Sequence, residues 1–151
     1  VGINIGQFPQ IKNGDMQPVV VVGGCHNGLY NITMIRAILD VEGTSVFGYG
    51  YPVFICFSWG LVIKPIGGAI ASTGCTGYGL GNAGDPLGMS AELEVNFFYH
   101  IGNGTTNLAK AHGQAIAKYL NENPIYQSDA FIITNWALFG DPSLRFGGYS
   151  S

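Results

Sequence analysis

Charged side chains are scarce in this sequence, because only 10% of its 151 residues are Asp, Glu, Lys or Arg, against about 25% in an average soluble domain. Six basic and nine acidic residues give a net charge of −3, and the basic residues form no cluster. A nucleic-acid-binding surface requires such a cluster and is therefore not predicted. The hydrophobic content of 47% also excludes a disordered chain, which has too few apolar residues to build a core.

Long apolar runs are absent as well. The longest stretches, at 18–22 and 51–63, are interrupted by Gly, Pro, Ser or Lys, well short of the roughly 20 residues that a membrane-spanning helix needs. No membrane span is therefore predicted. The sequence begins with Val1 rather than Met and shows no signal peptide, which is typical of a processed or excised piece.

The three cysteines, Cys25, Cys56 and Cys75, cannot all pair within one chain, and no Cys-x-x-Cys spacing of the kind found in zinc or thioredoxin-like motifs occurs. Cys56 lies between Ile and Phe and is expected to be a small buried hydrophobe. Cys75 lies in a glycine-rich stretch, where an exposed thiol or an external disulfide is conceivable.

Glycine, by contrast, is abundant: 24 of 151 residues, about 16%, against an average of about 7%. The glycines follow no fixed period, which excludes collagen and repeat arrays, and they cluster around short apolar runs. This pattern predicts tight loops on a compact fold, and the chain length is that of one domain.

Two runs predict buried strands that end in glycine turns. Residues 19–22 are four consecutive valines followed by two glycines, and a strand without polar alternation is expected to be buried on both faces in a parallel sheet. Residues 69–72 repeat this design, and residues 73–88 are expected to form a long loop. Residues 43–51 read as a loop or small hairpin, and residues 54–63 are ambiguous between helix and strand.

Helices are predicted at 32–39, from Ser90 through Tyr99, and most clearly at 108–120, where apolar residues recur at three- and four-residue spacings. Apolar runs at 131–134 and 136–138 then lead to a final strand or loop. The alternation predicts an α/β domain with a mostly parallel sheet and no internal repeat.

Cys25 directly follows the first predicted strand, where sites form in open α/β sheets. Its thiol could be a nucleophile, with backbone N–H groups of the following turn facing an oxyanion. The simpler alternative is a small buried hydrophobe, which the spacing by itself favours. Asp85 and Asp141, each before a proline, are expected to be turn formers.

A nucleophilic thiol also needs a base. His26 is adjacent in sequence, but neighbouring side chains diverge, so we do not expect it to reach the sulfur. His100 and His112 fall on predicted helices and are expected to be structural or surface residues.

Four segments resemble the gingipain-type cysteine peptidases (peptidase family C25, in the caspase-like clan), in the order found in that family. Residues 18–28, PVVVVGGCHNG, resemble the strand that ends in the nucleophile, and residues 69–74, AIASTG, resemble the strand beside the specificity pocket. Residues 92–119 resemble the paired helices behind the sheet, and LFGDPSL at 138–144 resembles the family's terminal signature.

The resemblance implies a caspase-like three-layer α/β/α sandwich with a mostly parallel sheet, incomplete in this chain. It implies Cys25 as nucleophile and oxyanion donor through its own N–H, and Tyr78, Ser72 and Thr73 as substrate-binding residues. The substrate would be a protein or peptide, and the location secreted or at the cell surface, which the sequons at Asn31 and Asn103 also fit. No metal ligand set or cofactor is identified, although structural calcium is an option that the resemblance brings.

The sequence departs from the family at one point. The family's catalytic histidine precedes the cysteine, but none of the 24 residues before Cys25 is His. The resemblance therefore implies an irregular segment at 1–17, the C-terminal part of a peptidase domain at 18–146 and a tail at 147–151. The partner would be the upstream half of the same domain, and this chain by itself would be inactive.

Two further expectations follow from this division. An incomplete sheet would expose an edge and allow self-association. A different class of function also stays open, namely a non-catalytic structural or adhesive cell-surface domain that keeps the peptidase fold. A His-Gly pair at a strand end upstream in the parent would favour the enzyme.

Overall fold

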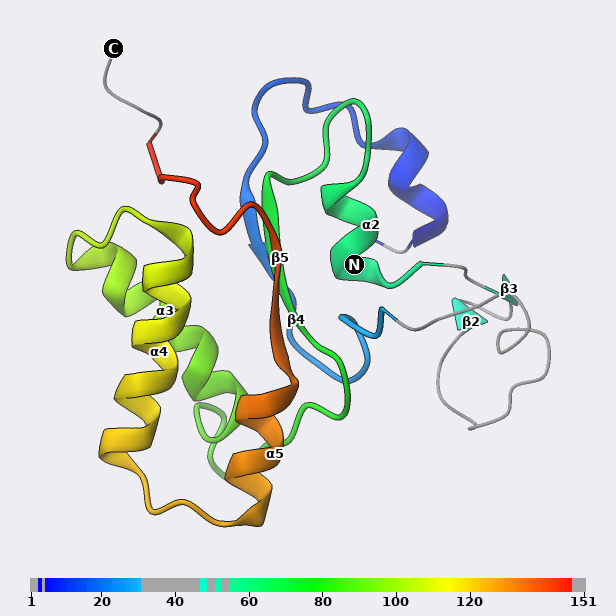
Figure 1. The fold of residues 1–151 in the computed structure, drawn as a ribbon. Helices are drawn as coiled ribbons and strands as arrows, with labels where there is room; N and C mark the ends of the chain where they lie inside the picture. The colour runs from blue at the N-terminus through cyan, green and yellow to red at the C-terminus, as the bar shows by residue number, and fades with distance from the viewer. Residues whose placement is uncertain (1–2, 4, 31–46, 49–50, 53–54, 148–151) are drawn as a thin grey trace.

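The computed structural model describes residues 3, 5–30, 47–48, 51–52 and 55–147. A three-stranded sheet lies between a layer formed by α3 and α4 and a layer formed by α2 and η1 (Figure 1). This arrangement confirms the predicted α/β class. The elements are η1 (Ile5–Gln10), β1 (Val19–Val21), β2 (Phe47–Gly48), β3 (Tyr51–Pro52), α2 (Phe57–Val62), β4 (Ala71–Cys75), α3 (Ser90–Gly102), α4 (Leu108–Glu122), α5 (Gln127–Asn135) and β5 (Trp136–Gly140).

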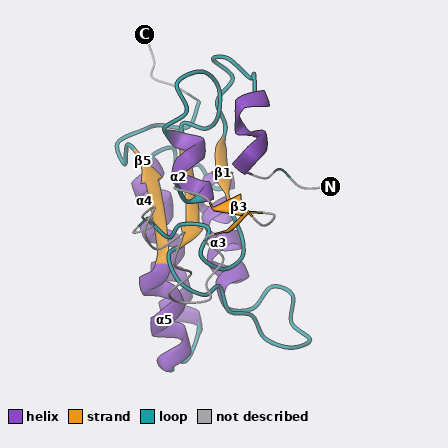
Figure 2. Cartoon of the chain, turned by 90° about the vertical axis from the view of Figure 1, so that its right-hand side faces the viewer, coloured by secondary structure: helices purple, strands orange, loops and turns teal. Residues whose placement is uncertain are grey.

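The sheet has the strand order β1-β4-β5 (Figure 2). β1 is parallel to β4, with Val21 opposite Thr73, and β5 runs antiparallel to β4, with Phe139 opposite Ser72. The carboxyl ends of β1 and β4 therefore meet at one edge of the sheet, where the loops that follow them lie side by side.

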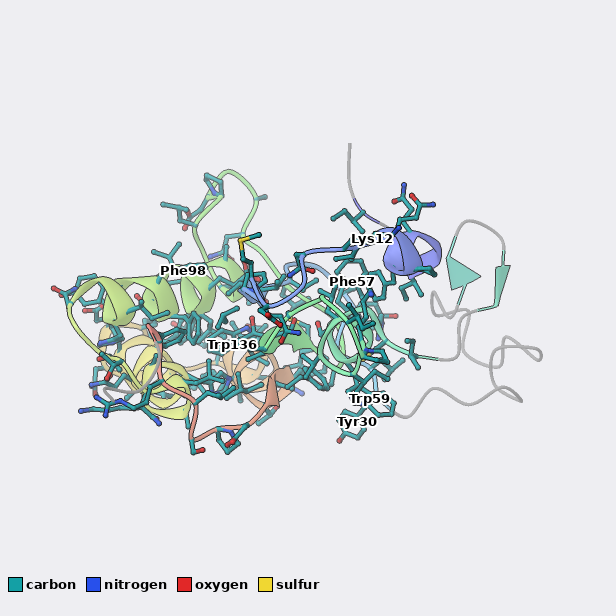
Figure 3. The ribbon with its side chains drawn as sticks, turned by 90° about the horizontal axis from the view of Figure 1, so that it is seen from above. Lys12, Tyr30, Phe57, Trp59, Phe98 and Trp136 are labelled. Atoms are coloured by element: carbon teal, nitrogen blue, oxygen red, sulfur yellow. The ribbon has the colours of Figure 1, made fainter. Side chains whose placement is uncertain are left out.

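β1 contributes to both layers, as its unbroken valine run predicts. Val19 and Val21 pack against the core under α3 and α4, and Val20 packs against the core under α2 and η1. The three valines are only half-buried, because β1 is the outer strand of the described sheet. Figure 3 shows the two layers from above, with Trp136 on the α3–α4 side and Phe57 on the α2 side.

β4 is the central strand, and all five of its residues are buried. The prediction of a strand at 69–72 followed by a loop from residue 73 is wrong in its bounds, because pairing on both sides continues the strand to Cys75. Cys75 is consequently buried in the sheet and not exposed in a loop. Position 74 requires glycine, because a Cβ atom there would clash with the Ser58 Oγ atom at 2.3 Å.

The helices predicted at 90–99 and 108–120 are confirmed as α3 and α4, each slightly longer than predicted. The ambiguous stretch at 54–63 contains α2, and the described part of 43–51 belongs to a small antiparallel hairpin of β2 and β3. The helix predicted at 32–39 lies outside the described residues. None of the helices in the described part of the chain is long and apolar enough to span a membrane.

The two apolar runs before the terminal signature differ in structure from the prediction. Residues 131–134 belong to α5, and only the second run forms a strand, β5. Asp129 starts this helix by accepting a hydrogen bond from the Tyr126 N–H at 2.9 Å, which satisfies a donor at the helix start. This bond supports a helix start, although isoleucines such as those that follow favour strands.

The terminal signature supports the start of α4. Asp141 accepts hydrogen bonds from the N–H of Ser143 at 2.8 Å and from its hydroxyl at 2.7 Å, and these bonds lower the pKa of Asp141. The turn they stabilise lets the Leu144 carbonyl accept the N–H of Leu108, the first residue of α4, at 2.9 Å. The predicted role of Asp141 as a turn former is confirmed.

A buried hydrogen bond connects α4 to α5. The hydroxyl of Tyr119 donates to the carboxylate of Asp129 at 2.6 Å, and both residues are almost fully buried. This bond lowers the pKa of Asp129, while burial and then the same bond raise the pKa of Tyr119. The bond therefore stabilises the folded chain more strongly while Asp129 is ionised.

We predict that Tyr119→Phe lowers the free energy of unfolding at neutral pH by about 2 kcal/mol, the usual value of a hydrogen bond to a charged group. Because the pKa of Asp129 is lower in the folded chain than in the unfolded one, this stabilisation is present above the ordinary Asp pKa and is lost as the pH falls through the folded-state pKa. Urea unfolding of both proteins across pH measures the difference, with the exposed Tyr99→Phe as control. A difference that does not change with pH would contradict the assignment.

Candidate functional site

Cys25 lies on a short loop at the carboxyl end of β1, residues 23–28, which we name the Cys25 loop. Cys25 is exposed, whereas Cys56 and Cys75 are buried. The alternative that Cys25 is a small buried hydrophobe is therefore wrong, and the prediction that Cys56 is buried is confirmed. Of the three thiols, Cys25 is the one that can meet a reagent from solvent.

Left-handed backbone on both sides of Cys25 produces this exposure. Gly24 has φ +102° and His26 has φ +57°, and the second value is uncommon for a residue with a side chain. The N–H of His26 donates to the Gly77 carbonyl at 2.7 Å, and the N–H of Gly28 donates to the Cys75 carbonyl at 2.8 Å. These bonds anchor the loop to the end of β4 and to the segment that follows.

The loop after β4, residues 76–89, is the second part of the site. The Cys25 thiol donates to the Gly79 carbonyl at 3.5 Å. The two backbones touch, because a Cβ atom on Gly79 would lie only 2.9 Å from the Gly24 carbonyl oxygen. Glycine at position 79 is therefore required by close packing against the Cys25 loop.

Backbone donors beside the thiol are available. Among the described residues, the N–H groups of Cys25 and Asn27 make no hydrogen bond, while those of His26 and Gly28 are engaged. Free N–H groups at a nucleophile can bind a developing oxyanion. The turn thus has donors of the type that acyl transfer needs.

Tyr78, a predicted substrate-binding residue, contacts this loop through His26. Its ring packs edge-on against the ring of His26, with 4.6 Å between the ring centroids and 70° between their planes. Tyr78 is 54% exposed, so one aromatic side chain stands at the surface within two residues of the carbonyl that the thiol contacts.

Ser72 and Thr73, the other two predicted substrate-binding residues, have no exposed surface. Both lie in the central strand β4, and the Ser72 hydroxyl donates to the Thr73 carbonyl at 3.3 Å. Neither hydroxyl is accessible to a substrate here, in contrast to Cys25 and Tyr78.

None of the three histidines of the sequence is hydrogen-bonded to Cys25. Both ring nitrogens of His26 are buried, and neither has a hydrogen-bond partner in the part of the chain that the structure describes. His112 stacks on Trp136, with 4.4 Å between the ring centroids, and burial lowers its pKa. His100 lies on α3 against Tyr99. The expectation that His26 does not act on the neighbouring sulfur stays a prediction.

Glu94 on α3 is a residue that the sequence reading missed. A Cβ atom on Gly23 would lie 3.3 Å from its carboxylate, so Glu94 borders the Cys25 loop. Burial raises the pKa of Glu94, and burial together with the charge of Glu94 raises the pKa of the Cys75 thiol to about 11. The signal that could have found Glu94 is its acidic charge beside the buried Leu93, in a sequence with few charges.

Among the residues that the structure describes, no group of three or more His, Cys, Asp or Glu side chains could hold a metal ion. Structural calcium, an option that the resemblance brings, stays a prediction. The site consists of a thiol, backbone donors and an aromatic ring.

Comparison with known proteins adds one finding. A family model described as peptidase family C25 matches residues 3–147, nearly the whole chain. The searches of curated proteins and of solved structures found no match.

We predict that Gly79→Ala displaces the Cys25 loop, because the new Cβ atom would clash with the Gly24 carbonyl. The expected cost is about 1–3 kcal/mol of unfolding free energy, as for other overpacked positions, together with a changed alkylation rate of Cys25. Gly81→Ala is the matched control, since a Cβ atom there meets nothing within 4 Å and should change stability by less than about 0.5 kcal/mol. Equal effects of the two variants on Cys25 alkylation would contradict the contact.

Proposed function

The chain belongs to peptidase family C25, and we propose that it carries the nucleophile of a cysteine-type endopeptidase, with Cys25 in that role. The observation that supports this most directly is the exposed thiol on a strained turn at the carboxyl end of β1, in a family of cysteine peptidases. The other two thiols are buried and cannot meet a peptide.

In the proposed reaction, the Cys25 thiolate attacks the carbonyl carbon of a peptide bond. The carbonyl oxygen becomes an oxyanion, which the N–H of Cys25 and a neighbouring backbone donor stabilise. The C–N bond then breaks, the amine leaves with a proton, and a thioester links Cys25 to the acyl part of the substrate. Water hydrolyses the thioester, which releases the acid and restores the thiol.

We place the base outside this chain, in an upstream half of the same domain. The Cys25 thiol donates to the Gly79 carbonyl, and no histidine of the sequence is bonded to it. A general base must lie within hydrogen-bond reach of the proton that it takes. In this proposal the chain by itself is inactive, and an upstream histidine completes the site.

The outer edge of β1 is where we propose that the upstream half joins. Among the described strands β1 pairs only with β4, so its other edge has free N–H and C=O groups. A strand added there would end beside Cys25. Without it, the same edge would favour self-association, which light scattering at increasing concentration would detect.

For the substrate, we propose a protein or peptide that passes Cys25 with one side chain against the exposed ring of Tyr78. The buried Ser72 and Thr73 would support this surface from within the sheet and not touch the substrate. A secreted or cell-surface location is part of the same proposal and rests on the family resemblance and the low charge.

A second candidate is a non-catalytic structural or adhesive domain that keeps the peptidase fold. The observation in its favour is that no base among the described residues is hydrogen-bonded to Cys25. Under this alternative the parent protein would lack a histidine at the strand end next to β1, and Cys25 would react like an ordinary thiol.

The proposal predicts that Cys25→Ser in the parent protein lowers peptidase activity by about 10⁴-fold or more, as expected for loss of a nucleophile. Cys56→Ser is the matched control, and its activity should be retained after correction for the folded fraction. Active-site titration with a peptidyl electrophile and peptide mass mapping should modify Cys25 alone. Equal activity of the Cys25→Ser variant and the unchanged parent would rule out the assigned role.

A further inference from the structure

His26 combines three features that packing alone does not require. Its backbone is left-handed at φ +57°, which costs free energy for any residue other than glycine. Both ring nitrogens are buried and have no hydrogen-bond partner among the described residues, which is also unfavourable. It directly follows the proposed nucleophile. Features of this kind cluster at functional sites, where the surrounding structure enforces them.

The ring of His26 packs against the ring of Tyr78. Their centroids are 4.6 Å apart and the planes are inclined by 70°, an edge-to-face geometry that is favourable for aromatic rings. The backbone reinforces the contact, because the His26 N–H donates to the carbonyl of Gly77, the residue before Tyr78, at 2.7 Å. Two contacts therefore join the residue after the nucleophile to a residue on the neighbouring loop.

The two rings differ in exposure in a way that assigns them different roles. His26 is half-buried, whereas Tyr78 is 54% exposed and presents its free face to solvent. His26 therefore supports the Tyr78 ring from inside. The Tyr78 ring is the part that a bound peptide can touch.

We propose that His26 is a positioning residue that acts through Tyr78: the imidazole holds the Tyr78 ring beside Cys25, and the exposed face of that ring receives a long side chain of the substrate. This inference rests on the proposed function, since it assigns a specificity surface to the same nucleophile. The role does not require His26 to exchange a proton with Cys25.

The test uses two peptidyl chloromethyl ketones that differ only in the residue next to the reactive group, norleucine in one and glycine in the other. Both alkylate Cys25 on the intact chain at a pH at which ordinary thiols are ionised, so that no base is needed. The ratio of the two alkylation rates reports contact with the side chain. Iodoacetamide, which carries no such side chain, reports the reactivity of the thiol itself.

His26→Asn removes the ring and keeps a residue that tolerates left-handed backbone, and Tyr78→Ala removes its neighbour. We expect each variant to lower the norleucine-to-glycine ratio about tenfold. The ratio of the double variant should be no lower than that of the single variant with the larger effect, because the two rings act as a unit. Iodoacetamide rates should stay within about threefold of the unchanged chain, since the thiol itself is retained.

Two variants serve as controls. His26→Phe keeps an aromatic ring against Tyr78 and should retain the ratio if it folds, which thermal unfolding checks. Tyr99→Ala removes a tyrosine of nearly equal exposure, 53%, that also packs edge-on against a histidine, at 5.3 Å. It lies on α3, outside both loops of the site, and should leave the ratio unchanged.

An unchanged ratio in His26→Asn would overturn the inference, and so would effects of the two single variants that simply add. The proposed function would fail in a different way. In that case Cys25→Ser in the parent protein would keep its peptidase activity, a result that does not depend on the norleucine-to-glycine ratio of this chain.

Discussion

The parallel pairing of β1 with β4 is the constraint on which the candidate site depends. With Val21 opposite Thr73, the two strands end together, and the chain must leave both of them at the same edge of the sheet. The Val22 N–H continues the pairing by donating to the Thr73 carbonyl at 3.2 Å. The loops that follow therefore start side by side, and the contact of the Cys25 thiol with Gly79 is a direct consequence.

Close packing of the Cys25 loop against β4 and against the loop after it explains the glycines at positions 28 and 79. A Cβ atom on Gly28 would lie 2.8 Å from the Gly74 carbonyl oxygen, and one on Gly79 would lie 2.9 Å from the Gly24 carbonyl oxygen. Backbone meets backbone at both points, so no side chain fits between. The result is a turn that is held firmly at both ends while Cys25, at its tip, stays exposed.

Two thiols at the ends of neighbouring strands differ in burial and therefore in chemistry. Cys75 is the last residue of β4, inside the sheet, where burial and the charge of Glu94 raise its pKa to about 11. Cys25, only a few residues beyond the matching point of β1, is exposed and lies next to free backbone N–H groups. In the proposed function the chain thus supplies a nucleophile, oxyanion donors and an aromatic surface, and it receives its base from elsewhere.

Local patterns in the sequence were sufficient for the α/β class, the two long helices, the role of β1 in both layers and the place of Cys25 at a strand end. These features depend on periodicity and on runs of like residues, which act within one element. The sequence did not reveal where β4 ends, that α5 forms over an isoleucine-rich run, or that Glu94 borders the Cys25 loop. Each of these depends on a partner distant in the chain or on a single capping bond. Exposure was likewise decided by tertiary structure: Cys25 and Cys75 both follow small or β-branched runs, and only the packing of the sheet leaves one thiol in solvent and buries the other.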